Sequence, residues 1–228
     1  KRLNNIFFDL YINIEKIAKR LLEYNFNPNV SYIFWPLHLQ TEAAMAVYGF
    51  PYINQMSLIE SVSRVMPYGT YLYIREHPYH KDKFSYKLMH KLSKLPNVRI
   101  ISANVSIHDI LKNTIGIITY NATTGIEALM YGKPVLSFSP NVYYKHHPAV
   151  DYCSDPYELG TKLSKLINTK VKHEDTIKYI QKMFQISNDI PMEADSFLSI
   201  EDAKEKAEKF VDHVKAAIDI CFEETNNV

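Results

Sequence analysis

In the stretch YLYIREHPYH, residues 71–80, a run of aromatic and aliphatic residues leads into two charged residues, a histidine and a proline. Pro78 restricts the residue before it to an extended conformation. An imidazole held there can donate a hydrogen bond to a phosphate oxygen, or act as an acid toward a leaving phosphate. A lone histidine is usually structural, so the role of His77 depends on its surroundings. We interpret Glu76 as structural and leave the role of Arg75 open.

A second polar stretch, Asn121 to Gly125, joins an apolar run to a predicted helix. Backbone N–H groups at the start of a helix lack intrahelical partners, and together with the helix dipole they favour a bound phosphate. The side chains of Asn121, Thr123 and Thr124 can add hydrogen bonds. The competing interpretation is that Asn121 or Thr123 simply caps the helix.

Glu127 lies in the first turns of the same predicted helix. Its carboxylate either stabilises the positive end of the helix or accepts hydrogen bonds from ribose hydroxyls. Gly132, Lys133 and Pro134 are predicted to end this helix and begin the next strand. We assign Lys133 no chemistry.

Two further polar clusters are predicted to follow strands. One contains His38, Gln40 and Glu42, for which a solvated loop is an equally good interpretation. The other is YYKHHP, residues 143–148, whose polar and aromatic residues can stack on a base or contact an anion: Tyr143, Tyr144, Lys145 and His146. The histidine pairs His77/His80 and His146/His147 lack further residues that could complete a metal site, so we predict no metal site.

Composition narrows the class of protein. The 228 residues are 46% apolar and 22% charged, as in soluble globular proteins. A net charge of +1 argues against binding nucleic acid by bulk electrostatics. Two cysteines, Cys153 and Cys221, are too few for a disulfide framework, which favours a reducing cytosol. No apolar run approaches the ~18 residues of a membrane span, and no signal peptide opens the chain.

Apolar runs alternate with amphipathic stretches along most of the chain, which predicts an α/β fold. We expect a Rossmann-like parallel sheet, flanked by helices, whose strands all end on one edge: residues 31–37, 70–75, 98–102, 116–120 and 134–138. Helices are expected at 5–24, 54–66, 82–94, from 106, 123–131, 155–168, 171–186 and 200–223. The expected domains are an N-terminal helix and linker (1–30), a Rossmann-like nucleotide-binding domain (31–170) and C-terminal helices (171–228). The carboxyl ends of parallel strands are where ligands bind, and the polar clusters all fall there.

The order and spacing of several motifs resemble the bacterial capsule polysaccharide synthesis family, which includes Kdo transferases. The motifs are PLHLQTEAA, LYIREHP, NVRIIS and ITYNATTGIEALMYGKPVLSF, and the resemblance covers roughly residues 30–170. It implies the C-terminal, donor-binding half of a two-domain GT-B glycosyltransferase.

The resemblance also implies roles for particular residues. His77 and Pro78 would contact the phosphate of a CMP-sugar, with His77 as the catalytic residue. The family's Asn-Ser-Thr-x-Gly turn falls on residues 121–125, where Ala122 replaces the usual serine. Glu127 would bind the ribose or the sugar. The base that activates the acceptor would lie in an N-terminal domain, and because the chain begins at Lys1, we expect it to be a piece of a longer protein.

We therefore expect a glycosyltransferase that uses a CMP-linked sugar in capsule or surface polysaccharide synthesis, with a saccharide or lipid-linked acceptor. No cofactor, metal or nucleic acid is expected. The location would be the cytoplasm, with peripheral association to the inner membrane. The alternatives are an enzyme of the UDP-N-acetylglucosamine 2-epimerase type and a non-catalytic nucleotide-binding or assembly module.

Overall fold

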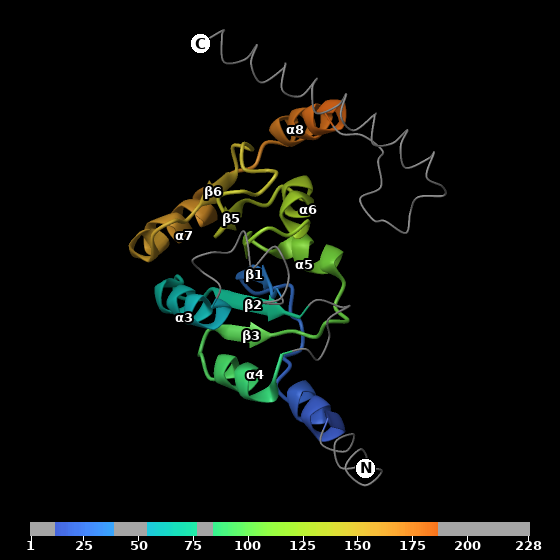
Figure 1. The fold of residues 1–228 in the computed structure, drawn as a ribbon, viewed down its shortest axis with the longest axis vertical. Coiled ribbons are helices and arrows are strands. Elements are labelled where there is room, and N and C mark those ends of the chain that lie inside the picture. Colours follow the sequence, from blue (N-terminus) through green and yellow to red (C-terminus); the bar gives the residue numbers. More distant parts are fainter. Residues whose placement is uncertain (1–11, 39–53, 77–83, 187–228) are drawn as a thin grey trace, which may run out of the picture. The chain divides into compact units, whose positions relative to one another are not determined.

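The computed structural model describes residues 12–38, 54–76 and 84–186, drawn in colour in Figure 1. The chain divides into two compact units, one up to His173 and one from Glu174 onward. Of the second unit the structure describes helix α8, His173–Ile186. Among the described residues, no helix is both long and apolar enough to cross a membrane.

The first unit is built on a six-stranded sheet of order β3-β2-β1-β4-β5-β6. Its strands are β1 (Tyr32–Pro36), β2 (Tyr71–Arg75), β3 (Val98–Ile100), β4 (Gly116–Thr119), β5 (Val135–Ser137) and β6 (Val150–Tyr152). All neighbouring strands pair in parallel, so their carboxyl ends share one edge. The predicted Rossmann-like parallel sheet is confirmed, and strand β6 is an addition to it.

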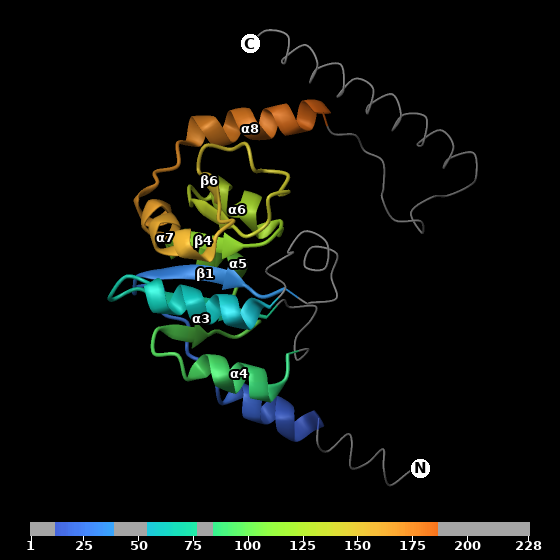
Figure 2. The ribbon, with the colours of Figure 1, turned by 60° about the vertical axis from the view of Figure 1, so that its left-hand side comes forward.

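Helices cover both faces of this sheet, as Figure 2 shows. One face carries α3 (Gln55–Val65), α4 (Tyr86–Ser93) and α7 (Leu159–Asn168), the last preceded by a short 3-10 turn, Pro156–Glu158. The other face carries α5 (Ile107–Asn113) and α6 (Thr124–Met130). These bounds place the predicted helices correctly to within a few residues at most ends.

The core forms because alternate side chains of each strand point to opposite faces of the sheet. Ile33 and Trp35 of β1 join the apolar cluster under α3, α4 and α7. Tyr32, on the other face, donates its hydroxyl to the Ile110 carbonyl of α5 at 2.7 Å. Gly116 allows α7 to approach closely, because a Cβ there would lie 3.0 Å from Leu166.

Helix α6 ends as its sequence predicts. Gly132 has a φ of 68°, a left-handed conformation that favours glycine. The N–H groups of Gly132 and Lys133 donate to the carbonyls of Leu129 and Ala128, which is the Schellman pattern. The chain therefore turns directly from α6 into β5.

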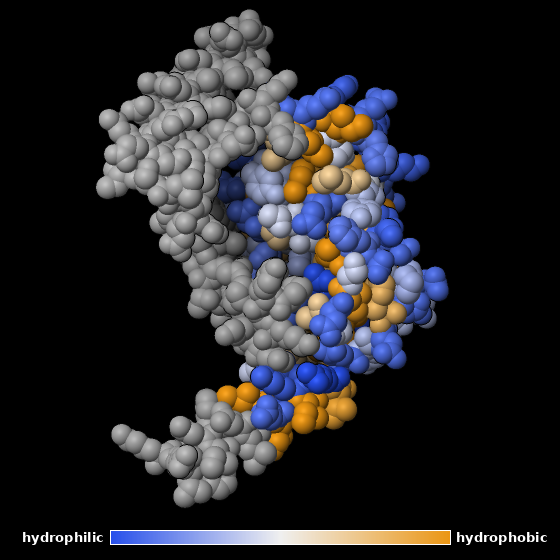
Figure 3. Space-filling view, turned by 90° about the vertical axis from the view of Figure 1, so that its right-hand side faces the viewer, coloured by the Kyte–Doolittle hydropathy of each residue, from blue (hydrophilic) through white to orange (hydrophobic). Residues whose placement is uncertain are grey.

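A helix over residues 12–20 precedes the sheet and packs beside α4. Glu15 Oε1 accepts from the Tyr86 N–H at the start of α4 at 2.7 Å. Several apolar side chains of this segment do not face the described core: Ile14, Ile17 and Leu21 are exposed, and Figure 3 shows hydrophobic side chains gathered on the surface there. Lys19 is buried instead. The predicted helical residues 5–11 and 200–223 lie outside the described part of the chain.

Candidate functional site

The order in which the chain adds strands to the sheet reverses between β1 and β4. From β1 the chain proceeds outward through β2 and β3, and β4 begins the opposite half of the sheet. In parallel α/β sheets the crevice outside the carboxyl ends of the strands at this switch point is where ligands bind. The residues that follow β1, β4 and β5 are therefore the candidates for a site.

His38 lies at this switch point, just beyond β1, and is buried. Its backbone N–H donates to Gln55 Oε1 at 3.0 Å, and Gln55 Nε2 donates back to the His38 carbonyl. Its ring nitrogen Nε2 lies 3.3 Å from the Thr119 hydroxyl at the end of β4. His38 is thus fixed by helix α3 and by the neighbouring strand, rather than placed in a solvated loop. Gln40 and Glu42, predicted with it, lie outside the described residues.

The turn between β4 and α6 begins at the same edge. Gly125 N–H donates to the Ala122 carbonyl at 2.9 Å, and Thr123 occupies the N-cap position of α6 without a side-chain capping bond. Asn121 Oδ1 is buried and has no hydrogen-bond partner among the residues that the structure describes. The simple capping interpretation is therefore wrong for Thr123. Thr123 is exposed and Thr124 is half-buried.

Tyr144 packs directly against this turn. It is fully buried and its hydroxyl donates to the Ala122 carbonyl at 3.0 Å. A Cβ on Gly125 would lie 2.1 Å from the Tyr144 ring, so only glycine fits there. Tyr144 is consequently unavailable to stack on a base, whereas its neighbours Tyr143, Lys145 and His146 are exposed.

Arg75 ends strand β2 on the face covered by α5 and α6. Its side chain is buried, it donates from Nη1 to the Val105 carbonyl at 2.6 Å, and it lies over the Phe34 ring. Burial lowers the pKa of this guanidinium, and the nearby Glu127 carboxylate opposes that shift. The role of Arg75 was open from the sequence. In the structure its positive charge interacts with the carboxylate of Glu127 on α6.

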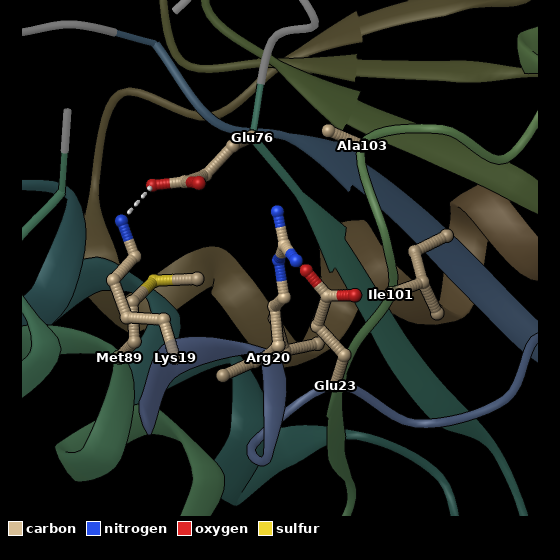
Figure 4. Close-up of a pocket in the computed structure, with 8 residues that line it drawn as sticks. Lys19, Arg20, Glu23, Glu76, Met89, Ile101 and Ala103 are labelled. Atoms are coloured by element: carbon tan, nitrogen blue, oxygen red, sulfur yellow. Dashed lines mark hydrogen bonds and ion pairs between the residues drawn. The ribbon is translucent and has the colours of Figure 1, made fainter. Parts of the chain in front are cut away.

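Glu76 points to the opposite face and is structural. Its carboxylate oxygen Oε1 lies 3.2 Å from Lys19 Nζ and accepts the Phe84 N–H at 3.2 Å. Lys19 Nζ also donates to the Phe84 carbonyl at 2.6 Å. Figure 4 shows this pair facing each other beside a small pocket that Arg20, Glu23 and Met89 also line. No sequence pattern predicts the burial of Lys19, because this lysine occurs among other charged residues of an amphipathic stretch.

The structure thus brings His38 next to Thr119, and Tyr144 next to the turn at residues 121–125. His77 and Pro78 lie outside the described residues. Within the described ranges, no group of three or more His, Cys, Asp or Glu side chains is arranged to hold a metal ion. The only described cysteine, Cys153, is a buried thiol without a disulfide.

Fold and site together define a doubly wound α/β domain with polar groups at its switch point. The family of capsule polysaccharide biosynthesis proteins matches residues 11–147, more than half of the chain. The chain belongs to this family. A search of curated proteins found no match.

Two solved structures illustrate what the fold of this chain is similar to. The UDP-GlcNAc 2-epimerase of Methanocaldococcus jannaschii is 14% identical, with a TM-score of 0.49, over 75% of this chain and 49% of that chain. KpsC, the beta Kdo 2,7 transferase of Thermosulfurimonas dismutans, is 16% identical, with a TM-score of 0.45, over 79% of this chain and 63% of that chain. The chain therefore spans about half to two thirds of the length of these solved proteins.

Proposed function

We propose that this chain is the donor-binding part of a glycosyltransferase that takes a CMP-linked sugar in the synthesis of a capsule or other surface polysaccharide. The proposal rests on one observation: the family match and the expected ligand-binding position of the fold fall on the same turn. The residues matched by the capsule family include the turn at 121–125, and this turn lies at the switch point of a doubly wound sheet, where such sheets bind ligands.

The donor would lie along the carboxyl edge of the sheet. The Thr123 and Thr124 hydroxyls would donate hydrogen bonds to the donor phosphate, and His77 and Pro78 would contact the same phosphate. Glu127 would accept hydrogen bonds from ribose hydroxyls. Exposed Tyr143 and Lys145 would supply a ring for the base and a cation for the anionic donor. Asn121 and Gly125 would complete the turn.

Glycosyl transfer breaks the bond between the sugar and the donor phosphate, so negative charge develops on the leaving phosphate. A protonated His77 would stabilise that charge or transfer a proton to it. The acceptor, a saccharide or a lipid-linked saccharide at the cytoplasmic face of the inner membrane, must also lose a proton from its hydroxyl. We assign no residue of this chain to that base, and we assign the reaction no cofactor.

Calorimetric titration with CMP and with UDP tests this proposal. We expect the chain to bind CMP, and His77→Ala to weaken that binding about 10- to 150-fold, the loss of one charge-assisted hydrogen bond. His90→Ala, on helix α4, is the matched control and should leave the affinity unchanged. Equal CMP affinity in a folded His77→Ala protein would remove His77 from the site, and binding of UDP but not CMP would favour the epimerase-type alternative.

A further inference from the structure

The hydrogen bond from Tyr144 to the turn has a defined direction. A carbonyl oxygen only accepts, so the Tyr144 hydroxyl must donate its proton to Ala122. Thr119 also lies close enough to the Tyr144 hydroxyl to lower its pKa, against the effect of burial. On its other side, Thr119 Oγ1 lies 3.3 Å from His38 Nε2, in a hydrogen bond whose direction depends on the histidine tautomer. Thr119 therefore lies between His38 and Tyr144, and Tyr144 is bonded to the turn.

These three residues come from the ends of three strands at the switch point. His38 follows β1, Thr119 ends β4, and Tyr144 lies in the segment after β5. Thr119 and Tyr144 are fully buried and His38 is 7% exposed. Burial raises the pKa of the Tyr144 hydroxyl, as does the neighbouring Tyr143, so the hydroxyl keeps its proton at neutral pH.

Tyr144 also sets the shape of the turn by contact. Its ring fills the space beside Gly125 that a Cβ would need, and its hydroxyl fixes the peptide between Ala122 and Thr123 through the Ala122 carbonyl. The bond goes to the main chain of residue 122, so the alanine that replaces the usual serine does not remove it. The turn is held from outside its own sequence.

We propose that Tyr144 is a positioning residue that holds the turn at 121–125 in its ligand-binding shape, and that His38 and Thr119 orient the Tyr144 hydroxyl. This inference rests on the proposed function for its effect on nucleotide binding. It does not require Tyr144 to touch the ligand. The buried polar residues at the switch point thus hold the turn in place and take no direct part in the reaction.

The test compares two tyrosines that each donate a buried hydroxyl to a backbone carbonyl. Tyr144→Phe removes the bond to Ala122, and the control Tyr32→Phe removes the 2.7 Å bond to Ile110 on α5. We expect similar losses of thermal stability from both substitutions. Only Tyr144→Phe should weaken CMP binding, by about three- to tenfold, and only it should speed hydrogen–deuterium exchange of the amides at residues 121–125.

Thr119 separates a hydrogen-bonding role from a packing role. Thr119→Val should reproduce the loss of affinity, Thr119→Ser should restore it, and combining Thr119→Val with Tyr144→Phe should add little. Equal CMP affinity and equal exchange at the turn in the Tyr144→Phe and Tyr32→Phe proteins would overturn the inference. If the unmodified protein binds no nucleotide, the proposed function fails, and the exchange measurement alone decides whether Tyr144 holds the turn.

Discussion

At the residue scale, the need for a glycine at position 125 comes from a residue that is distant in the sequence, Tyr144. The sequence pattern places Gly125 in a turn that favours a bound phosphate. In the folded chain it is the point at which the Tyr144 ring approaches the backbone. No pattern of local spacing links these two residues, because the contact depends on how the segment after β5 returns to the sheet edge.

We predict that Gly125→Ala destabilises the protein by about 1–3 kcal/mol, the usual cost of forcing extra volume into a packed site. The control is Gly160→Ala in α7, where a Cβ meets nothing within 4 Å. That substitution should be neutral or stabilise by up to about 1 kcal/mol. Urea denaturation of the two proteins measures the difference, and equal stabilities would show that Tyr144 moves aside freely.

At the element scale, the buried Lys19–Glu76 pair joins the helix at 12–20 to the end of β2 and to Phe84. Removing the cation from a buried ion pair is costly because the carboxylate stays behind in a poorly solvated place. We predict that Lys19→Met lowers the free energy of unfolding by about 3 kcal/mol. Lys91→Met, which breaks a pair whose lysine is 66% exposed, should cost less than about 1 kcal/mol. Equal losses would contradict the structural role of Lys19.

A second element-scale prediction concerns strand β6 and helix α7. Burial tends to raise the pKa of Asp151, but hydrogen bonds from Lys165 and Lys162 outweigh it and hold the pKa below its usual value. A lowered folded-state pKa stabilises the protein above the unfolded-state pKa of about 3.9, and this contribution is lost as the pH falls through the folded value. Asp151→Asn should therefore cost about 1 kcal/mol at pH 7 and much less near pH 2. A loss independent of pH would contradict this account.

Sequence patterns predicted five of the strands because each has an apolar run flanked by turn residues. They missed β6, whose three residues are all half-buried and show no apolar pattern. They also did not predict the burial of Lys19, since nothing local to a lysine reveals a carboxylate that arrives from a distant strand. The polar clusters after β1, β4 and β5 were predicted from the shared edge of a parallel sheet, but the bonds from His38 to Thr119 and from Tyr144 to Ala122 required the fold.

At the scale of the whole molecule, binding and transfer are separable. We assign no residue of the chain to the base that activates the acceptor. Positioning of an acceptor and base catalysis each contribute orders of magnitude in rate. We therefore predict that the purified chain binds a cytidine nucleotide weakly but does not transfer sugar from a CMP-sugar to a lipid-linked acceptor. Donor-dependent transfer would contradict this prediction, and Glu42 would then be the first residue to test as the base.

The central claim is that a nucleotide binds at the carboxyl edge of the sheet, at its switch point. Titrating isotope-labelled protein with CMP and following the backbone amide resonances tests both the binding and its place. We predict saturable shifts concentrated at residue 38, at residues 119–127 and at residues 143–146, with the amides of α7 unchanged. Absence of any shift, or shifts confined to residues at the amino ends of the strands, would contradict the claim.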